Sequence, residues 1–267
     1  MSRIATRFAA LRKVNRAAFV AFVSGGDPDF DTGLAILRRL VEAGADILEI
    51  GISFTDPMAD GPTIQAGGAR ALAAGMNTKR IFDLVRAFRV EDNDTPVVLM
   101  GYFNPIYRYG TARFATDARA AGVDGLITVD LPPEEEDELR GPAEGAGLDI
   151  VRLVAPTTDE ERLPLLLERA SGFVYYVSIV GITGTRSPSM VDVEYAIARL
   201  RRFTDLPVAV GFGINTAEQA GAVARVADGA VVGSALVHEI GVGGSDMLDR
   251  VSVLARTLAH GVAGARA

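Results

Sequence analysis

The sequence predicts a single (β/α)8 barrel domain spanning residues 1–267. Short apolar, β-branched segments bounded by Gly, Pro or Asp occur eight times, and segments of helical periodicity separate them. The length of 267 residues is close to the roughly 250 residues typical of this barrel. A doubly wound open sheet is the alternative, but it usually has fewer strands in a chain of this size, with polar edge strands.

The chain begins with a segment that we interpret as an amphipathic helix, because Ile4, Phe8 and Leu11 lie on one face at helical spacing. The first 26 residues are basic and contain no acidic residue, which is also typical of a signal or transit peptide. The apolar run Ala17–Val23 is short for such a peptide. It therefore favours a helix that leads into a first buried strand.

The remaining elements follow from the same alternation of apolar runs and helical periodicity. The strands are expected to begin near Phe19, Asp46, Val97, Asp124, Asp149, Phe173, Pro207 and Asp228. The helices are expected over Thr32–Ala43, Ile64–Ala74, Thr78–Arg89, Thr111–Ala121, Glu134–Gly145, Asp159–Arg169, Val191–Phe203, Thr216–Ala224 and Ser245–His260.

Two intervals between strands are longer than the others, after the second and the sixth strand. They predict extended loops at Gly51–Pro62 and Gly181–Ser189, at the barrel face where enzymes of this fold carry out their chemistry. Their glycines are suited to a closing lid, although glycine-rich surface loops without a function are also common.

Composition excludes several classes of function. The formal charge of −7 and the pI of about 5.0 do not fit a nucleic-acid binder, which needs clustered positive charge. The absence of cysteine excludes disulfides and thiolate nucleophiles, and it agrees with a cytoplasmic location. The longest apolar runs are too short to span a bilayer.

Metal and Schiff-base chemistry are also disfavoured. The histidines, His238 and His260, do not have the spacing of a metal site. The lysines, Lys13 and Lys79, do not end a segment that resembles a strand. We therefore expect no metal in this chain.

Glu49 is the first candidate catalytic residue. Strand alternation places it on the same face as Ile47 and opposite Leu48 and Ile50. A carboxyl group inside a barrel mouth has a raised pKa, as a general acid and base requires. The alternative is a glutamate held in an ion pair with an arginine.

Asp60 is the second candidate, at the end of the loop that follows the second strand. An Asp before Gly61-Pro62-Thr63 is equally typical of a helix N-cap, so the spacing leaves both interpretations open. Two carboxyl groups with different solvation would supply an acid and a base at one site.

Glycines follow the last two expected strands, in Gly211–Thr216 and Gly233–Leu236. The loops after strands 7 and 8 of a barrel often bind phosphate through backbone amides and a short helix. The segments match neither a Walker A motif nor a complete G-x-G-x-x-G motif, and ordinary turns remain the alternative. Together these features indicate proton-transfer chemistry on a phosphorylated small molecule, either isomerisation or carbon–carbon cleavage.

The segment Leu48–Gln65 resembles the signature of the tryptophan synthase α-subunit family. The segments Phe22–Asp27, Met100–Pro105, Asp130–Pro133 and Gly181–Arg186 support this resemblance, which extends over essentially the whole chain. It implies a lyase that cleaves indole-3-glycerol phosphate to indole and glyceraldehyde 3-phosphate by a retro-aldol reaction. It further implies that indole passes to a β subunit, which makes tryptophan with pyridoxal phosphate, in a cytoplasmic α2β2 heterotetramer. No cofactor is expected in this chain.

The resemblance also implies a role for each matching residue. Glu49 would be the acid/base at indole C3 and the glycerol hydroxyl, and Asp60 would interact with the indole N–H. The other expected site residues are Phe22, Ile64, Met100, Ile127, Tyr175 and Phe212 in the indole pocket, Thr183 in the lid, Gly184, Gly213, Gly233 and Ser234 at the phosphate, and Asp56, Pro57, Asn104 and Pro132 at the β subunit.

The sequence departs from the usual family pattern near these residues. Ser53 occupies the position of a proline, Thr55 that of a serine, and Met58 and Met100 those of leucines. Two other hypotheses remain open: a free-standing indole-glycerol-phosphate lyase, and a barrel without catalysis that binds and activates the β subunit.

Overall fold

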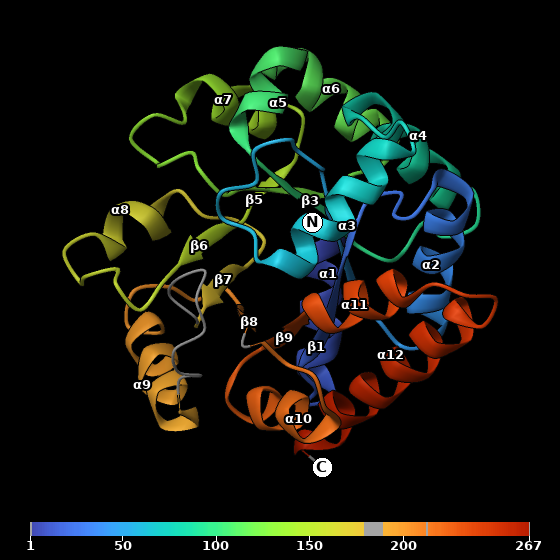
Figure 1. Cartoon of the computed structure of the whole chain (residues 1–267). Coiled ribbons are helices and arrows are strands. Elements are labelled where there is room, and N and C mark those ends of the chain that lie inside the picture. Colours follow the sequence, from blue (N-terminus) through green and yellow to red (C-terminus); the bar gives the residue numbers. More distant parts are fainter. Residues whose placement is uncertain (1, 179–188, 212, 267) are drawn as a thin grey trace.

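Nine parallel strands form the centre of the protein in a computed structural model, which describes residues 2–178, 189–211 and 213–266. Figure 1 shows these strands gathered inside a ring of helices. The strands are β1 (Ala18–Ser24), β2 (Ile47–Gly51), β3 (Val97–Gly101), β4 (Gly125–Thr128), β5 (Asp149–Ile150), β6 (Arg152–Val154), β7 (Val174–Val177), β8 (Val208–Gly211) and β9 (Gly229–Val232).

The sheet closes into a barrel through the fifth expected strand. Its order is β5-β4-β3-β2-β1-β9-β8-β7-β6, and only Val151 separates the terminal strands β5 and β6 along the chain. The first half of this segment pairs with β4 and the second half with β7. The barrel prediction is confirmed. The expected fifth strand is divided because its backbone changes partner at Val151.

Helices cover the outside of the barrel and occupy most connections between strands. They are α1 (Arg3–Lys13), α2 (Phe30–Glu42), α3 (Pro62–Ala73), α4 (Thr78–Arg89), α5 (Phe103–Tyr109), α6 (Thr111–Ala121), α7 (Asp137–Gly145), α8 (Leu163–Glu168), α9 (Met190–Leu200), α10 (Ala217–Val226), α11 (Ser234–Val242), α12 (Met247–Ala263) and the 3-10 helix η1 (Gly264–Arg266). Within the described ranges, none is long and apolar enough to cross a membrane.

Most helix predictions are confirmed, and those for α4 and α6 match at both ends. Helix α8 is shorter than the expected Asp159–Arg169 and begins at Leu163, with Pro164 in its first turn, where proline is tolerated. Helix α5 was not predicted, because a seven-residue helix that contains Pro105 is too short to show helical periodicity. The extra residues after β2 form a loop and the additional helix α4.

Side chains divide into an inner and an outer apolar layer. Val20, Ile47 and Val98 belong to the inner layer, inside the barrel, whereas Leu48 and Ile50 pack between the strands and the helices. This is the alternation that the sequence predicts for β2. The face of Glu49 is therefore the barrel interior.

Helix α1 closes the amino-terminal end of the barrel. Ile4, Phe8 and Leu11 are buried against the inner layer, and the Phe8 ring centroid lies 5.7 Å from that of Phe173. The amphipathic helix is confirmed, and its apolar face seals the interior from solvent at this end.

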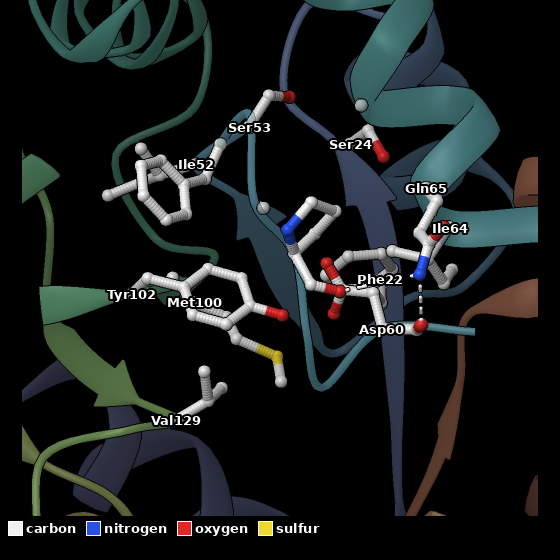
Figure 2. A pocket seen from close by; sticks show the side chains of 15 residues that line it. Phe22, Ser24, Ile52, Ser53, Asp60, Ile64, Gln65, Met100, Tyr102 and Val129 are labelled. Atoms are coloured by element: carbon white, nitrogen blue, oxygen red, sulfur yellow. Dashed lines mark hydrogen bonds between the residues drawn. The ribbon is translucent and has the colours of Figure 1, made fainter. Parts of the chain in front are cut away.

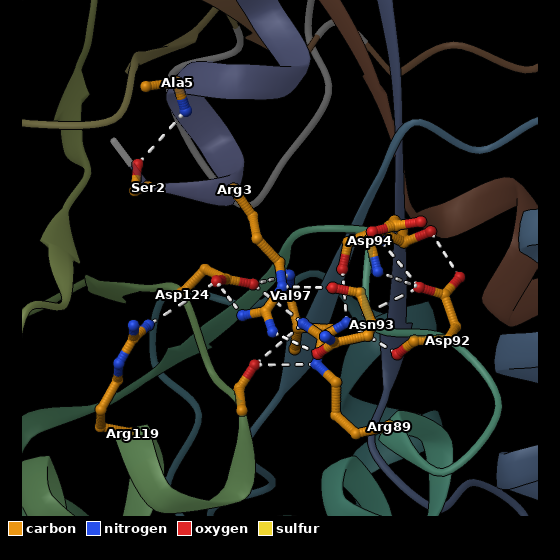
Figure 3. Close-up of polar contacts among 12 residues, drawn as sticks. Ser2, Arg3, Ala5, Arg89, Asp92, Asn93, Asp94, Val97, Arg119 and Asp124 are labelled. Atoms are coloured by element: carbon orange, nitrogen blue, oxygen red, sulfur yellow. Dashed lines mark hydrogen bonds and ion pairs between the residues drawn. The ribbon is translucent and has the colours of Figure 1, made fainter.

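Buried aspartates accept hydrogen bonds from amides near the beginnings of strands at the same end. Asp46 accepts a hydrogen bond from the Phe19 amide at 2.8 Å, and Asp124 accepts one from the Val97 amide at 2.9 Å. Val97 is the first residue of β3 and Phe19 the second of β1, and a buried amide at either place needs a partner. Figure 3 shows Arg3 and Arg89 beside Asp124, at 2.8 and 2.9 Å from its carboxylate oxygens. The arginines compensate the buried charges and stabilise this end.

Replacing Phe8 by Ala leaves a cavity between α1 and the barrel interior. We expect the free energy of unfolding to fall by about 3–5 kcal/mol, measured by urea denaturation. The control is Val14→Ala, because Val14 is 69% exposed and its truncation should change little. Equal effects of both substitutions would contradict the sealing role of α1.

Candidate active site

A solvent-open cavity of about 910 Å³ lies at the carboxyl ends of the strands. Its wall combines strand ends with the loop after β2 and the beginnings of α3 and α11. It is lined by Phe22, Glu49, Ala59, Asp60, Gly61, Ile64, Met100, Tyr175, Val177, Gly211, Gly213, Ile214, Val231, Gly233 and Ser234. The structure thus brings together both candidate carboxyl groups and most of the expected binding residues.

Glu49 is the innermost charged group of this cavity. It lies between Phe22 of β1 and Val98 of β3 in the strand register, and it is 1% exposed. Among the described residues, neither carboxyl oxygen has a hydrogen-bond partner and no arginine forms an ion pair with it. Burial raises the pKa of Glu49 to about 8, since the charged form loses its hydration. The alternative interpretation, in which Glu49 forms an ion pair with an arginine, is therefore not supported by the described residues.

Tyr175 on β7 shares the cavity with Glu49. Burial raises the pKa of the Tyr175 hydroxyl well above its ordinary value, and the nearby Glu49 carboxylate raises it further. The hydroxyl fits against Gly211 so closely that a Cβ atom at Gly211 would lie 2.6 Å from it. The absence of a side chain at Gly211 therefore leaves the space that the Tyr175 ring occupies.

Asp60 precedes α3, but it is not the helix cap. Gly61 is the N-cap, and it has no side-chain hydrogen bond to the helix. The Gln65 side chain donates to the Asp60 main-chain carbonyl at 2.8 Å, which leaves the carboxyl group free to face the cavity. Burial raises the pKa of Asp60, while a hydrogen bond from the Tyr102 hydroxyl lowers it. The N-cap interpretation is wrong.

Tyr102 is a site residue that the sequence interpretation missed. Its hydroxyl accepts a hydrogen bond from the Ala59 amide at 2.9 Å and donates to Asp60. Burial and the adjacent Asp60 charge raise the Tyr102 pKa to about 12. Its position directly after the third strand was the available signal, because polar residues at the carboxyl ends of barrel strands often serve the site.

A smaller pocket of about 410 Å³, shown in Figure 2, adjoins the cavity. The two share Phe22, Asp60, Ile64 and Met100. The Ser53 hydroxyl is buried here, and within the described ranges it has no hydrogen-bond partner. This residue, in the place of the usual proline, adds a polar group to a mainly apolar wall.

The beginning of α11 forms the opposite end of the cavity. Gly233 is its N-cap and has no side chain to satisfy the first amides. Gly233, Ser234 and Gly213 line the cavity, so these amides and the positive end of the helix dipole are suited to an anion. The short helix expected here is confirmed.

The other expected site residues lie in several places. Ile127 is buried in the inner layer, next to Met100 in the strand register, and not in the cavity wall. Thr183, Gly184 and Phe212 lie outside the described residues, as does most of the expected loop Gly181–Ser189.

The four residues expected at the β subunit lie on the loops after β2 and β4 and in the first turn of α5, at the cavity face. Asp56, Asn104 and Pro132 are exposed, and Pro57 is half-buried. The Phe103 amide donates to Asp130 at 2.7 Å, which links the loops after β3 and β4. Among the described residues, no group of three His, Asp or Glu side chains is arranged to hold a metal ion.

The fold and the position of the site define a (β/α)8-barrel enzyme with its chemistry at the carboxyl ends of the strands. The family model of the tryptophan synthase alpha chain matches residues 8–263. A tryptophan synthase alpha chain from Gluconacetobacter diazotrophicus is 57% identical over the full length of both chains. The chain therefore belongs to the tryptophan synthase alpha chain family.

Solved structures agree with this assignment. The tryptophan synthase alpha subunit of Legionella pneumophila superposes with a TM-score of 0.91 at 37% identity, covering 98% of both chains. The tryptophan synthase of Mycobacterium tuberculosis gives 0.91 at 39% identity, covering 98% of this chain and 99% of the matching chain. The chain is a lyase that cleaves indole-3-glycerol phosphate.

The raised pKa of Glu49 predicts a pH-dependent stability. Its pKa rises from 4.5 to about 8 on folding, so its stabilising contribution is complete below the unfolded value and is lost as the pH rises toward 8. Relative to Glu49→Gln, the wild-type unfolding free energy should fall by on the order of 1.4 kcal/mol per pH unit in this window. Denaturant titrations at several pH values measure it. Parallel pH profiles of the two proteins would contradict the assignment.

Replacing Gly211 by Ala should displace the Tyr175 ring into the cavity and lower kcat/KM for indole-3-glycerol phosphate. The added Cβ would lie 2.6 Å from the Tyr175 hydroxyl and 3.1 Å from its nearest ring carbon. Combining it with Tyr175→Phe removes the worst overlap, so we expect partial recovery relative to Gly211→Ala alone. Steady-state kinetics of both variants and of Tyr175→Phe test this. No recovery in the double variant would contradict the steric explanation.

Proposed function

We propose that Glu49 is the general acid and base of the cleavage reaction. The observation that carries this proposal is the burial of its carboxyl group without a hydrogen-bond partner among the described residues. With a pKa of about 8, the carboxyl group holds a proton at neutral pH. A group whose pKa lies near the working pH serves best in both proton donation and proton acceptance.

The proposed reaction uses this proton twice. Glu49 donates it to indole C3, and the iminium form of the ring becomes the electron sink. The resulting Glu49 carboxylate takes the proton of the hydroxyl group on the adjacent carbon. The bond between that carbon and C3 breaks, its electron pair returns to the indole ring, and the hydroxyl-bearing carbon becomes the aldehyde. Glu49 ends in its protonated form.

Asp60 is proposed to stabilise the positive charge that develops on the indole nitrogen. Its carboxylate lies in the same cavity as Glu49, and the Tyr102 hydroxyl holds it by a hydrogen bond. Burial raises the pKa of Asp60, and this bond opposes the rise by favouring the charged form. The two carboxyl groups are thereby assigned different tasks, a proton carrier and a fixed negative charge.

The substrate would lie between the apolar wall and the beginning of α11. Phe22, Ile64, Met100 and Tyr175 are proposed to contact the indole ring, and Gly213, Gly233 and Ser234 to bind the phosphate. Thr183, Gly184 and Phe212, which lie outside the described residues, are proposed to serve in the lid, the phosphate site and the indole pocket, respectively. This arrangement holds both ends of the substrate, so the reacting carbon lies beside Glu49.

We propose an α2β2 assembly in which pyridoxal phosphate belongs to the β subunit and this chain carries no cofactor. Asp56, Pro57, Asn104 and Pro132 would contact the β subunit, because they lie on the loops after β2 and β4 and in the first turn of α5, at the cavity face. A cytoplasmic location agrees with the absence of cysteine.

Release of indole from indole-3-glycerol phosphate tests the proposed function. We expect slow release by the purified chain, a marked increase on adding a tryptophan synthase β subunit, and a loss of at least about 100-fold in Glu49→Gln. Binding of the variant to the β subunit, measured by calorimetry, is the control for folding.

Other outcomes would decide between the remaining hypotheses. Rapid release that is indifferent to the β subunit would favour a free-standing lyase. No release by the wild-type chain would favour the non-catalytic barrel, and full activity of Glu49→Gln would contradict the role of Glu49.

A further inference from the structure

An ion pair between a buried aspartate and a half-buried arginine lies where three elements that line the cavity meet. Arg70 on α3 donates to Asp27, in the connection after β1, through Nε at 2.8 Å and a terminal guanidinium nitrogen at 2.7 Å. Asp27 is 1% exposed, and its side chain is completely covered. A two-bond contact of this kind fixes the orientation of both groups, as a single contact does not.

Helix α11 packs against the same place. A Cβ atom at Gly241 of α11 would lie 3.1 Å from the Arg70 guanidinium. A Cβ atom at Gly67 of α3 would lie 2.7 Å from Val237 of α11 and 3.0 Å from the Asp27 carboxylate. The glycines let α3, α11 and the end of β1 approach one another around the ion pair.

Each of these elements carries a different part of the site. Asp60 immediately precedes α3 and is held to it through Gln65. Ser234 begins α11 at the phosphate end, and Phe22 lies on β1. A small displacement of α3 would therefore change the distance from Asp60 to the bound indole ring without changing the phosphate site.

We propose that Arg70 and Asp27 are positioning residues, which hold α3 against β1 and α11 so that Asp60 meets the indole nitrogen while the phosphate is bound at α11. The inference rests on the proposed function, since it acts through Asp60. Misplacement by about 1 Å can reduce catalysis on the order of 100-fold. Stability alone does not require this arrangement, because an apolar contact of similar volume stabilises a buried interface at least as well.

A double-mutant cycle on ligand binding tests the proposal. The ligand is indole-3-propanol phosphate, which lacks the hydroxyl needed for cleavage, and calorimetry gives its Kd for wild type, Asp60→Ala, Arg70→Met and the double variant. We expect Asp60→Ala and Arg70→Met each to weaken binding about tenfold. The double variant should bind no more weakly than Asp60→Ala, because Arg70 acts through Asp60. Independent effects, about 100-fold together, would overturn the proposal.

A ligand without the indole ring separates positioning from general loosening. Arg70→Met should leave the Kd of glycerol 3-phosphate unchanged, because that ligand uses only the phosphate end. An equal loss for both ligands would overturn the proposal. Arg70→Lys keeps the charge without the planar fork, so we expect it to recover part of the affinity for the indole ligand.

The matched control is Arg89→Met at the amino-terminal end, where Arg89 lies 2.9 Å from the buried Asp124. It removes a comparable ion pair and should lower the Tm without changing either Kd. If the single variant Arg70→Met is too unstable, the double variant Asp27→Asn/Arg70→Met takes its place in the cycle, because it removes both charges of the ion pair. If the wild-type chain neither bound indole-3-propanol phosphate nor cleaved indole-3-glycerol phosphate, the proposed function itself would be overturned.

Discussion

The burial of Glu49 without a compensating partner in the described structure is the constraint on which the account of this protein depends. An ionised carboxylate at such a position is costly, so the group retains its proton at neutral pH. That condition requires an apolar barrel interior, closure of the opposite end by α1, and access to the group from the cavity alone. The strand register supplies the placement, and the inner apolar layer supplies the surroundings.

The buried carboxyl groups at the two ends of the barrel differ in their hydrogen-bond and ion-pair partners. At the amino-terminal end, Asp46 and Asp124 accept hydrogen bonds from strand amides and from arginine guanidinium groups. At the carboxyl end, Glu49 has neither kind of partner within the described residues, and Asp60 has the neutral Tyr102 hydroxyl. The first arrangement serves stability. The second leaves Glu49 able to gain and lose a proton during a reaction.

Local patterns in the sequence were sufficient to predict features that depend on a single segment, such as the direction of a side chain on a strand or a helix. The alternation along β2 predicts that Glu49 faces inward, and the spacing of Ile4, Phe8 and Leu11 predicts α1. The local sequence left the role of Asp60 undecided, because it is equally typical of a helix N-cap and of a residue in the cavity wall. Only the cap at Gly61 and the bond from Gln65 separate the two interpretations.

Features that depend on segments distant in the sequence were not predicted. The contact of Tyr102 with Asp60 joins the ends of β2 and β3, and the ion pair of Asp27 with Arg70 joins β1 to α3. Similarly, the fifth expected strand is divided because its first half pairs with β4 and its second half with β7. Hydrophobic periodicity contains no information on such contacts.

The protonation state of Glu49 tests the central claim most directly. Carbon-13 NMR of the glutamate-labelled chain, with Glu49→Gln to assign the signal, would follow this carboxyl group from pH 5 to pH 9. We expect a protonated carboxyl group at pH 7 that titrates near pH 8, in agreement with the pKa of about 8. A group already ionised at pH 6 would contradict it, because Glu49 would then have no proton to donate to the indole ring.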